Sequence, residues 1–184
     1  MPPPPTVSRL LFWPTFLWNA LLGRVLGVRR WWDRVDHHLL LGALPLRRDV
    51  AALAAEGVAA VVNTCEEYAG PVEEYRRYGI EQLRVPTTDF HPPTLDSIRL
   101  AVDFIQQHVA AGQSVYVHCK AGRARSATVV LCWLVAYRGM TVEQAQRHLL
   151  ACRPHVMATL GQRTVVQEWA ASCSPVIATA SSDR

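Results

Sequence analysis

The chain has 184 residues, enough for one domain with a hydrophobic core and hardly enough for two. Half of the residues are hydrophobic, which excludes an intrinsically disordered chain. The formal net charge of +4 suits an anionic substrate or a membrane surface and is too weak to indicate nucleic-acid binding.

The amino-terminal 32 residues differ from the rest, because they carry four arginines and no acidic residue. An apolar run over 10–22 is shorter than the roughly 20 residues that a transmembrane helix needs, and Pro14 and Asn19 interrupt it. We therefore expect residues 1–32 to be a targeting or membrane-associating segment. The alternative is a helix that packs on the protein's own core.

The remainder alternates between buried strands and amphipathic helices, which indicates one domain over 33–173 and a disordered tail over 174–184. Asp49, Thr94 and the pair Thr141 and Gln144 are candidate helix caps. The expected strands cover 39–42, 58–63, 83–85 and 115–117, and the expected helices cover 49–57, 94–112, 125–139, 141–152 and 162–172. Such alternation predicts an α/β fold, with a central, largely parallel sheet flanked by helices.

The segment from Val115 to Ser126 carries the strongest functional signal. Its strand leads into a five-residue loop, and a helix begins near Arg125. Backbone N–H groups in such a loop point inward at the positive end of the helix dipole, so the loop is an anion-binding nest. A thiol at Cys119 would ionise below its usual pKa of about 8.5, and Arg125 offers a planar fork for two phosphate oxygens. The pattern predicts Cys119 as a nucleophile and Arg125 as a phosphate clamp.

Other residues of this loop have predicted supporting roles. Ser126 can donate a hydrogen bond to the thiolate, and His118 is expected to brace the loop by hydrogen bonds. Lys120 and Arg123 are either exposed loop charges or, as we favour, contacts to a polyanionic substrate. The predicted substrate-binding residues are Lys120, Ala121, Gly122, Arg123 and Ala124.

Acidic residues follow two other strands. Asp89 lies in a proline-flanked loop and is predicted to protonate the leaving alkoxide and then to activate water. Asp96 falls in the first turn of the next helix, where an acid complements the helix dipole. Glu66 or Glu67 could hold Arg125 in its phosphate-binding rotamer; the alternative is two solvated glutamates. This chemistry needs no metal and no cofactor, and the five cysteines, an odd number without close pairs, indicate a reducing compartment.

The His-Cys-x5-Arg-Ser pattern of His118 to Ser126 is that of the cysteine-dependent phosphatases. Together with the stretches over 41–47, 63–68, 93–96 and 115–123, it closely resembles the mitochondrial dual-specificity-type phosphatase family over about residues 9–172. That family converts phosphatidylglycerophosphate to phosphatidylglycerol on the way to cardiolipin. Ala124 departs from the pattern, because the family usually has Ser there.

The placement of Cys119 between strand, nest and helix predicts a phosphocysteine intermediate, and the resemblance implies an anionic phospholipid substrate. We expect a monomer that lies peripherally on the matrix side of the mitochondrial inner membrane, held there by the arginines and tryptophans of residues 9–32. Two alternatives remain. One is the same chemistry on phosphoproteins or phosphoinositides. The other is an inactive phosphatase-fold binding module, which the joint presence of Cys119, Arg125, Asp89 and Ser126 opposes.

Overall fold

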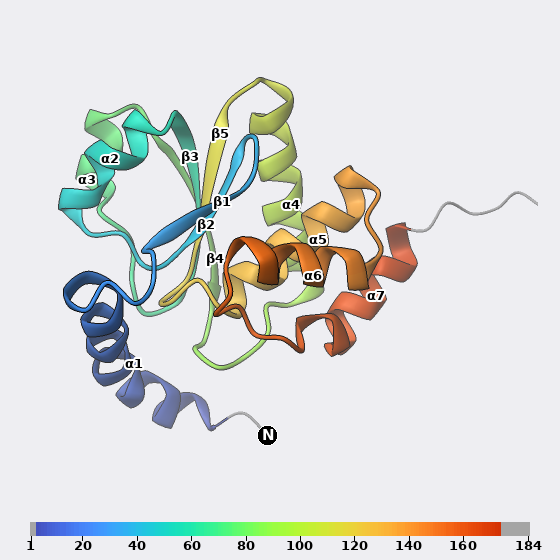
Figure 1. Ribbon diagram of the computed structural model, residues 1–184, viewed down its shortest axis with the longest axis horizontal. Helices are drawn as coiled ribbons and strands as arrows, with labels where there is room; N and C mark the ends of the chain where they lie inside the picture. The colour runs from blue at the N-terminus through green and yellow to red at the C-terminus, as the bar shows by residue number, and fades with distance from the viewer. Residues whose placement is uncertain (1–2, 174–184) are drawn as a thin grey trace, which may run out of the picture.

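A single sheet of five strands in the order β1-β2-β5-β3-β4 forms the centre of the molecule (Figure 1). The computed structural model describes residues 3–173. The strands are β1 (Trp32–Asp36), β2 (Leu39–Gly42), β3 (Val58–Cys65), β4 (Glu81–Thr87) and β5 (Ser114–His118). β1 pairs with β2 antiparallel, and the other neighbours are parallel. The expected α/β fold with a largely parallel sheet is confirmed.

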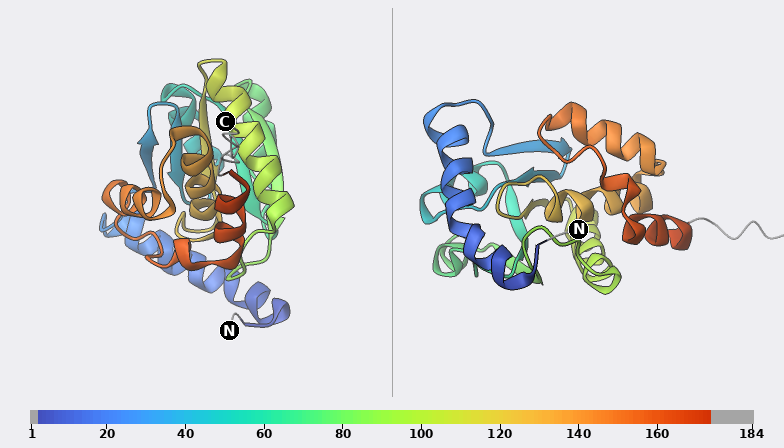
Figure 2. Two further views of the ribbon diagram at one scale, coloured as in Figure 1. Left: turned by 90° about the vertical axis from the view of Figure 1, so that its right-hand side faces the viewer. Right: turned by 90° about the horizontal axis from the view of Figure 1, so that it is seen from below.

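Helices cover both faces of this sheet. The face covered by α4, α5 and α6, with α7 packed upon them, lies opposite the face covered by α2 and α3 (Figures 1 and 2). The helices are α1 (Pro5–Ala20), α2 (Val50–Ala55), α3 (Val72–Arg77), α4 (Leu95–Ala110), α5 (Arg125–Arg138), α6 (Val142–Cys152) and α7 (Thr164–Cys173). Short turns are the π-helical η1 (Leu21–Val25) and the 3-10 segments η2 (Arg47–Asp49) and η3 (Leu160–Gln162).

Alternation along the central strands divides the core between the two faces. In β5, Val115 and Val117 pack in the large cluster under α4 and α5, whereas Tyr116 packs with the residues of α2 and α3. All five residues of β5 are buried. A strand buried on both faces reads as a continuous apolar run, which is why its position could be predicted.

The helix caps agree with expectation at two of three sites. The Thr94 hydroxyl accepts the Ser97 N–H at 3.2 Å, and Thr141 with Gln144 forms the predicted capping box. Asp49 occupies the N-cap position of α2, but its side chain makes no capping hydrogen bond there. Its carboxylate instead accepts the Leu46 N–H at 2.7 Å and pairs with Arg24. The last helix begins at Thr164, after η3, and the predicted tail lies outside the described residues.

Helix α1 lies at the end of the sheet where the parallel strands finish (Figures 1 and 2). One side of it buries Phe12 and Phe16 against Leu44, Cys65 and Cys119, so α1 does pack on the protein's own core. The opposite side is an apolar stripe, which we call the outer face. It consists of Leu10, Trp13, Leu17 and Trp18, all exposed. No helix within residues 3–173 is both long and apolar enough to cross a membrane.

Candidate active site

The loop between β5 and α5 folds around the sulfur of Cys119. The Gly122 N–H donates to Sγ at 3.2 Å. Gly122 has φ of 65°, and a Cβ there would come within 2.5 Å of the Gly42 backbone. Glycine therefore lets the loop curl tightly over the end of β2 while its backbone N–H groups face inward.

Two opposing effects determine the ionisation of Cys119. Burial raises the pKa of this thiol, but the Arg125 charge and the donors of Ser126 and the Ala121 backbone outweigh it, and the pKa falls to about 7. The Ser126 hydroxyl is buried and has no hydrogen-bond partner within residues 3–173, so its proton is available to the thiolate. A substantial fraction of Cys119 is therefore the nucleophilic thiolate at neutral pH.

Arg125, the first residue of α5, is buried with its guanidinium held on two sides. One terminal nitrogen donates to Glu67 Oε2 at 2.9 Å and to the Thr87 carbonyl at 2.7 Å, and the other donates to Asp89 Oδ1 at 2.9 Å. Glu67 Oε1 also accepts the Asp89 N–H at 2.8 Å. Glu67 thus fixes both the clamp and the loop that carries the candidate acid.

Glu66 points elsewhere, which separates the two glutamates that the sequence left equivalent. Its carboxylate accepts the Thr88 hydroxyl at 2.7 Å and pairs with Arg9 of α1. Arg125 is therefore supported by Glu67 and not by Glu66.

Lys120 is buried, with 7% of its surface exposed, and is not a free loop charge. Its ammonium pairs with the second carboxylate oxygen of Asp89 and donates to the Thr15 hydroxyl of α1 at 2.5 Å. The rings of Phe12 and Phe90 flank it, with its Nζ 5.3 and 4.8 Å from their centroids. The candidate acid is consequently held between Lys120 and Arg125.

His118 does not brace the loop as expected. Neither ring nitrogen has a hydrogen-bond partner among the described residues, and the ring stacks on Tyr116 at 5.7 Å. Burial lowers the pKa of His118 to about 3, so the ring is neutral. Its part in the structure is packing behind the loop, while its backbone carbonyl accepts the Thr64 hydroxyl at 2.9 Å.

Arg153, for which no role was predicted, holds the backbone of the loop in place. Its buried guanidinium donates to the carbonyls of Ala121 and Gly122, both at 3.0 Å, and pairs with Asp33 at 2.5 Å. Because these carbonyls are held outward, the loop N–H groups are left to face the sulfur. Arg153 follows α6, 34 residues after Cys119, and no local sequence signal connects it to the loop.

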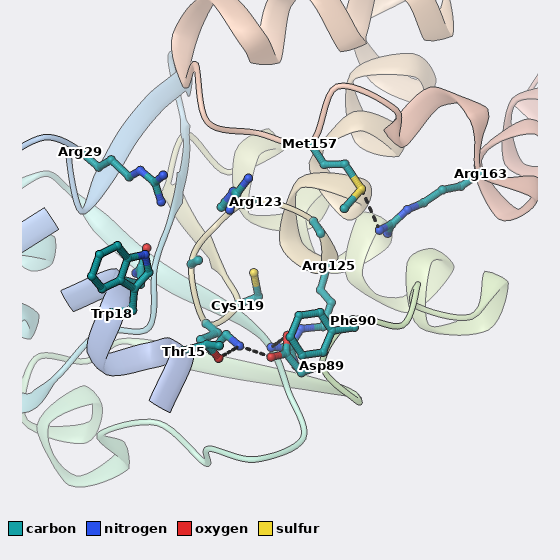
Figure 3. Close-up of a pocket in the computed structure, with 14 residues that line it drawn as sticks. Thr15, Trp18, Arg29, Asp89, Phe90, Cys119, Arg123, Arg125, Met157 and Arg163 are labelled. Atoms are coloured by element: carbon teal, nitrogen blue, oxygen red, sulfur yellow. Dashed lines mark hydrogen bonds and ion pairs between the residues drawn. The ribbon is translucent and has the colours of Figure 1, made fainter. Parts of the chain in front are cut away.

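A pocket of about 340 Å³ opens above Cys119 (Figure 3). The loop residues Lys120, Ala121, Arg123 and Ala124 line it, with Arg125 and Asp89. Helix α1 contributes Thr15, Trp18 and Asn19, and the rim holds Arg29, Met157 and Arg163. No role in the site was predicted for Thr15, Trp18, Asn19, Arg29 and Arg163, because their contacts join segments far apart in the sequence.

Comparison with known proteins agrees with this geometry. Residues 39–172 match the dual specificity phosphatase catalytic domain. The phosphatidylglycerophosphate phosphatase PTPMT2 of Arabidopsis thaliana is 43% identical over 172 residues, which cover 92% of this chain and 75% of that protein. The phosphatidylglycerophosphatase and protein-tyrosine phosphatase 1 of Homo sapiens is 40% identical, over 89% of this chain and 86% of that protein.

A solved structure supports the same family assignment. The crystal structure of PTPMT1 in complex with PI(5)P superposes with a TM-score of 0.71 at 34% identity, covering 78% of this chain and 97% of that one. The family expected from the sequence is thereby confirmed. The chain belongs to the dual specificity phosphatase family and is a cysteine-dependent phosphatase.

Proposed function

We propose that this protein hydrolyses phosphatidylglycerophosphate to phosphatidylglycerol through a phosphocysteine at Cys119. The observation that carries the chemistry is the buried cluster of Cys119, Arg125 and Asp89 in one pocket. The lipid substrate is supported by helix α1, whose Trp18 lines that pocket while 61% of its surface is exposed on the outer face. The names of the relatives point to the same substrate.

In the first step, the Cys119 thiolate attacks phosphorus, while Arg125 and the loop N–H groups hold the non-bridging oxygens. The phosphorus–oxygen bond to the lipid glycerol breaks, and Asp89 gives its proton to the departing oxygen. Asp89 is bound by Arg125 and Lys120, both cations. An incoming phosphate competes with Asp89 for Arg125.

In the second step, Asp89 accepts a proton from water, whose oxygen attacks the phosphocysteine. The sulfur–phosphorus bond breaks, inorganic phosphate leaves, and the thiolate returns. Donors around Cys119, including Ser126, stabilise this leaving group because they stabilise the thiolate. No step requires a metal ion.

Peripheral membrane binding, at the matrix side of the mitochondrial inner membrane, is part of the proposal. The outer face of α1 carries two tryptophans and two leucines beside the pocket, a composition suited to a lipid headgroup boundary. Deleting α1 would also remove Thr15 from the pocket and Phe12 from the buried cluster that contains Cys119, so point substitutions are the cleaner test.

The variant Leu10→Gln/Leu17→Gln changes residues that are 77% and 66% exposed, and Leu100→Gln on α4 is a matched control at 60%. We expect the double variant to lose vesicle binding and lipid turnover while its turnover of a soluble aryl phosphate stays unchanged. Equal vesicle binding by the double variant and the control would refute the membrane role of α1.

The substrate itself is tested by comparing purified protein on three substrates: phosphatidylglycerophosphate in vesicles, a phosphotyrosine peptide and monophosphorylated phosphoinositides. We expect the highest kcat/KM on phosphatidylglycerophosphate. A higher value on a phosphoinositide would move the assignment to that lipid, which a solved relative binds in its crystal structure. A higher value on the peptide would make the protein a phosphoprotein phosphatase.

A further inference from the structure

Three arginines that line the pocket, Arg29, Arg123 and Arg163, have no acidic partner among residues 3–173. Within residues 3–173, most arginines form an ion pair, as Arg30 and Arg153 do with Asp33. Arg29 and Arg123 line the pocket and pair with no carboxylate in that part of the chain. Unpaired cations that face a pocket are available to an anionic ligand.

Both side chains have free donors. Arg123 gives only its Nε–H, to the His155 carbonyl at 2.7 Å, so neither terminal nitrogen of its guanidinium is used by a described residue. Arg29 is half-buried, and its side chain donates to no residue of 3–173. A guanidinium with two open nitrogens matches a pair of phosphate oxygens.

The two guanidinium groups are close enough to affect one another. Burial and the neighbouring Arg29 lower the pKa of Arg123. Burial, Arg153, Arg29 and Arg123 together lower the pKa of His155 to about 3, so the imidazole beside them is neutral. This repulsion between like charges is relieved when an anion binds between them.

The position of the pair relative to α1 indicates which anion it takes. Figure 3 shows Arg29 and Arg123 on the same side of Cys119, with Trp18 beside Arg29. Arg163 lies across the pocket, where it donates to the Thr128 hydroxyl at 2.9 Å and to the Met157 sulfur at 3.4 Å. A group held by Arg29 and Arg123 therefore lies on the side of the pocket that Trp18 of α1 also lines.

We propose that Arg29 and Arg123 form a second anion subsite, which binds the phosphodiester of a substrate whose phosphate monoester lies at Cys119. The inference rests on the proposed function, because in a phospholipid headgroup the diester joins the polar end to the acyl chains. A phosphodiester is singly charged at every relevant pH, so two guanidinium groups can hold it without proton transfer. Glycerol and inositol headgroups share this chemistry.

Binding of soluble headgroups to the Cys119→Ser protein tests the subsite without turnover or vesicles. The two ligands are glycerol 3-phosphate, which has one phosphate, and glycerophosphoglycerol phosphate, which adds the diester. We expect the second ligand to bind at least about 10-fold more tightly by calorimetry. Adding Arg29→Gln or Arg123→Gln should remove most of that ratio, and Arg123→Lys should restore only part of it because an ammonium lacks the fork.

Arg30→Gln is the matched control, since it is the next residue and its side chain is 86% exposed. Equal affinities of the Cys119→Ser protein for the two ligands would refute the subsite. The subsite would also be refuted if the affinity ratio of the two ligands fell with Arg163→Gln and not with Arg29→Gln, because the diester would then bind on the opposite side of the pocket. A third ligand, glycerophosphoinositol 5-phosphate, tests whether the two arginines also accept the diester of an inositol headgroup. If it binds more tightly than glycerol 3-phosphate, and Arg29→Gln removes the difference, the subsite serves inositol lipids as well.

Failure of the subsite and failure of the proposed function give different results. If phosphatidylglycerophosphate is turned over but the soluble ligands bind equally, the substrate is right and the subsite is wrong. If the arginine-dependent ratio is present but phosphatidylglycerophosphate is not turned over, the subsite stands and belongs to another lipid.

Discussion

The base and the rim of the pocket differ in whether their cationic side chains are paired with carboxylates. At the base, Arg125 and Lys120 are buried and each is paired with a carboxylate. At the rim, Arg29 and Arg123 face the pocket with no acidic partner among residues 3–173. Ion pairs hold the side chains at the base in a fixed geometry, which bond cleavage in a water-poor site requires. The unpaired cations at the rim are available to bind an anionic ligand. The base therefore serves any phosphate monoester, and the rim selects among substrates.

The origin of the two regions in the chain differs as well. The base comes from loops that follow β3, β4 and β5, where parallel strands end together. Arg123 belongs to the loop after β5, as Cys119 does, but the rest of the rim comes from segments outside this strand series, namely α1, the turn before β1 and the segment after α6. Changes at the rim can thus alter specificity while leaving the chemistry in place. The predictions below test this division, beginning with the largest effect.

Cys119→Ser should reduce turnover of every substrate to background, because the hydroxyl is not ionised by surroundings that lower the pKa of a thiol to about 7. Rapid-quench mass spectrometry should detect phosphocysteine in the parent protein only. Cys173→Ser, at the end of α7, is the control and should keep full activity. Appreciable turnover by Cys119→Ser would remove Cys119 from the mechanism.

Asp89→Asn should lower kcat by about 10²- to 10⁴-fold on alkyl phosphates, the usual range for loss of a general acid. The loss should be much smaller on an activated aryl phosphate, whose leaving group departs without a proton. Asp96→Asn is the control, because the Asp96 side chain is 90% exposed in the first turn of α4. Equal losses of Asp89→Asn on both substrates would mean that Asp89 is not the acid.

Glu67→Gln should lower kcat/KM by about 10-fold, since an amide holds Arg125 and the Asp89 N–H less firmly than a carboxylate does. Glu66→Gln should change kcat/KM by less than about 2-fold. A positioning role also predicts weaker inhibition of the Glu67 variant by vanadate, with the thermal midpoint little changed. If Glu67→Gln and Glu66→Gln lose activity equally, the substitutions disturb the loop that carries both glutamates, and the support of Arg125 by Glu67 is not what matters.

Neighbouring glutamates show why part of the site could be predicted and part could not. The loop from Cys119 to Arg125 was predictable, because its strand, loop and helix are adjacent in sequence and each has a local signal. Glu66 and Glu67 have the same local signal. Only the loop carrying Thr88 and Asp89, which packs against them, decides that Glu67 meets Arg125.

The same limit applies to the fold. The buried strands and the Thr94 and Thr141 caps follow from local patterns, and they were predicted. The edge strand β1 mixes exposed and buried residues over five positions, and α3 has six residues, so neither gives a clear periodicity. The contact of Thr15 with Lys120 spans 105 residues, which is why α1 could be described from sequence only as apolar and basic.

The smallest expected effect is a shift in pH dependence at the base of the pocket. Thiolate is the reactive form of Cys119, so kcat/KM on an activated aryl phosphate, which needs no proton from Asp89, should rise with pH up to about 7. Ser126→Ala removes a donor that stabilises the thiolate, so the pKa of Cys119 rises and the acid limb moves to higher pH, by less than about one unit. The variant should therefore lose more activity at pH 6 than at pH 8.5.

Because the thiolate is also the leaving group of the second step, phosphocysteine should accumulate in Ser126→Ala during turnover. Arg29→Gln, at the rim, should leave the acid limb where it is, since Arg29 is not among the groups that set the Cys119 pKa. If the acid limb of the pH profile shifted equally in Ser126→Ala and Arg29→Gln, the base and the rim would act on Cys119 as one charged surface. The proposed division of roles between base and rim would then be wrong.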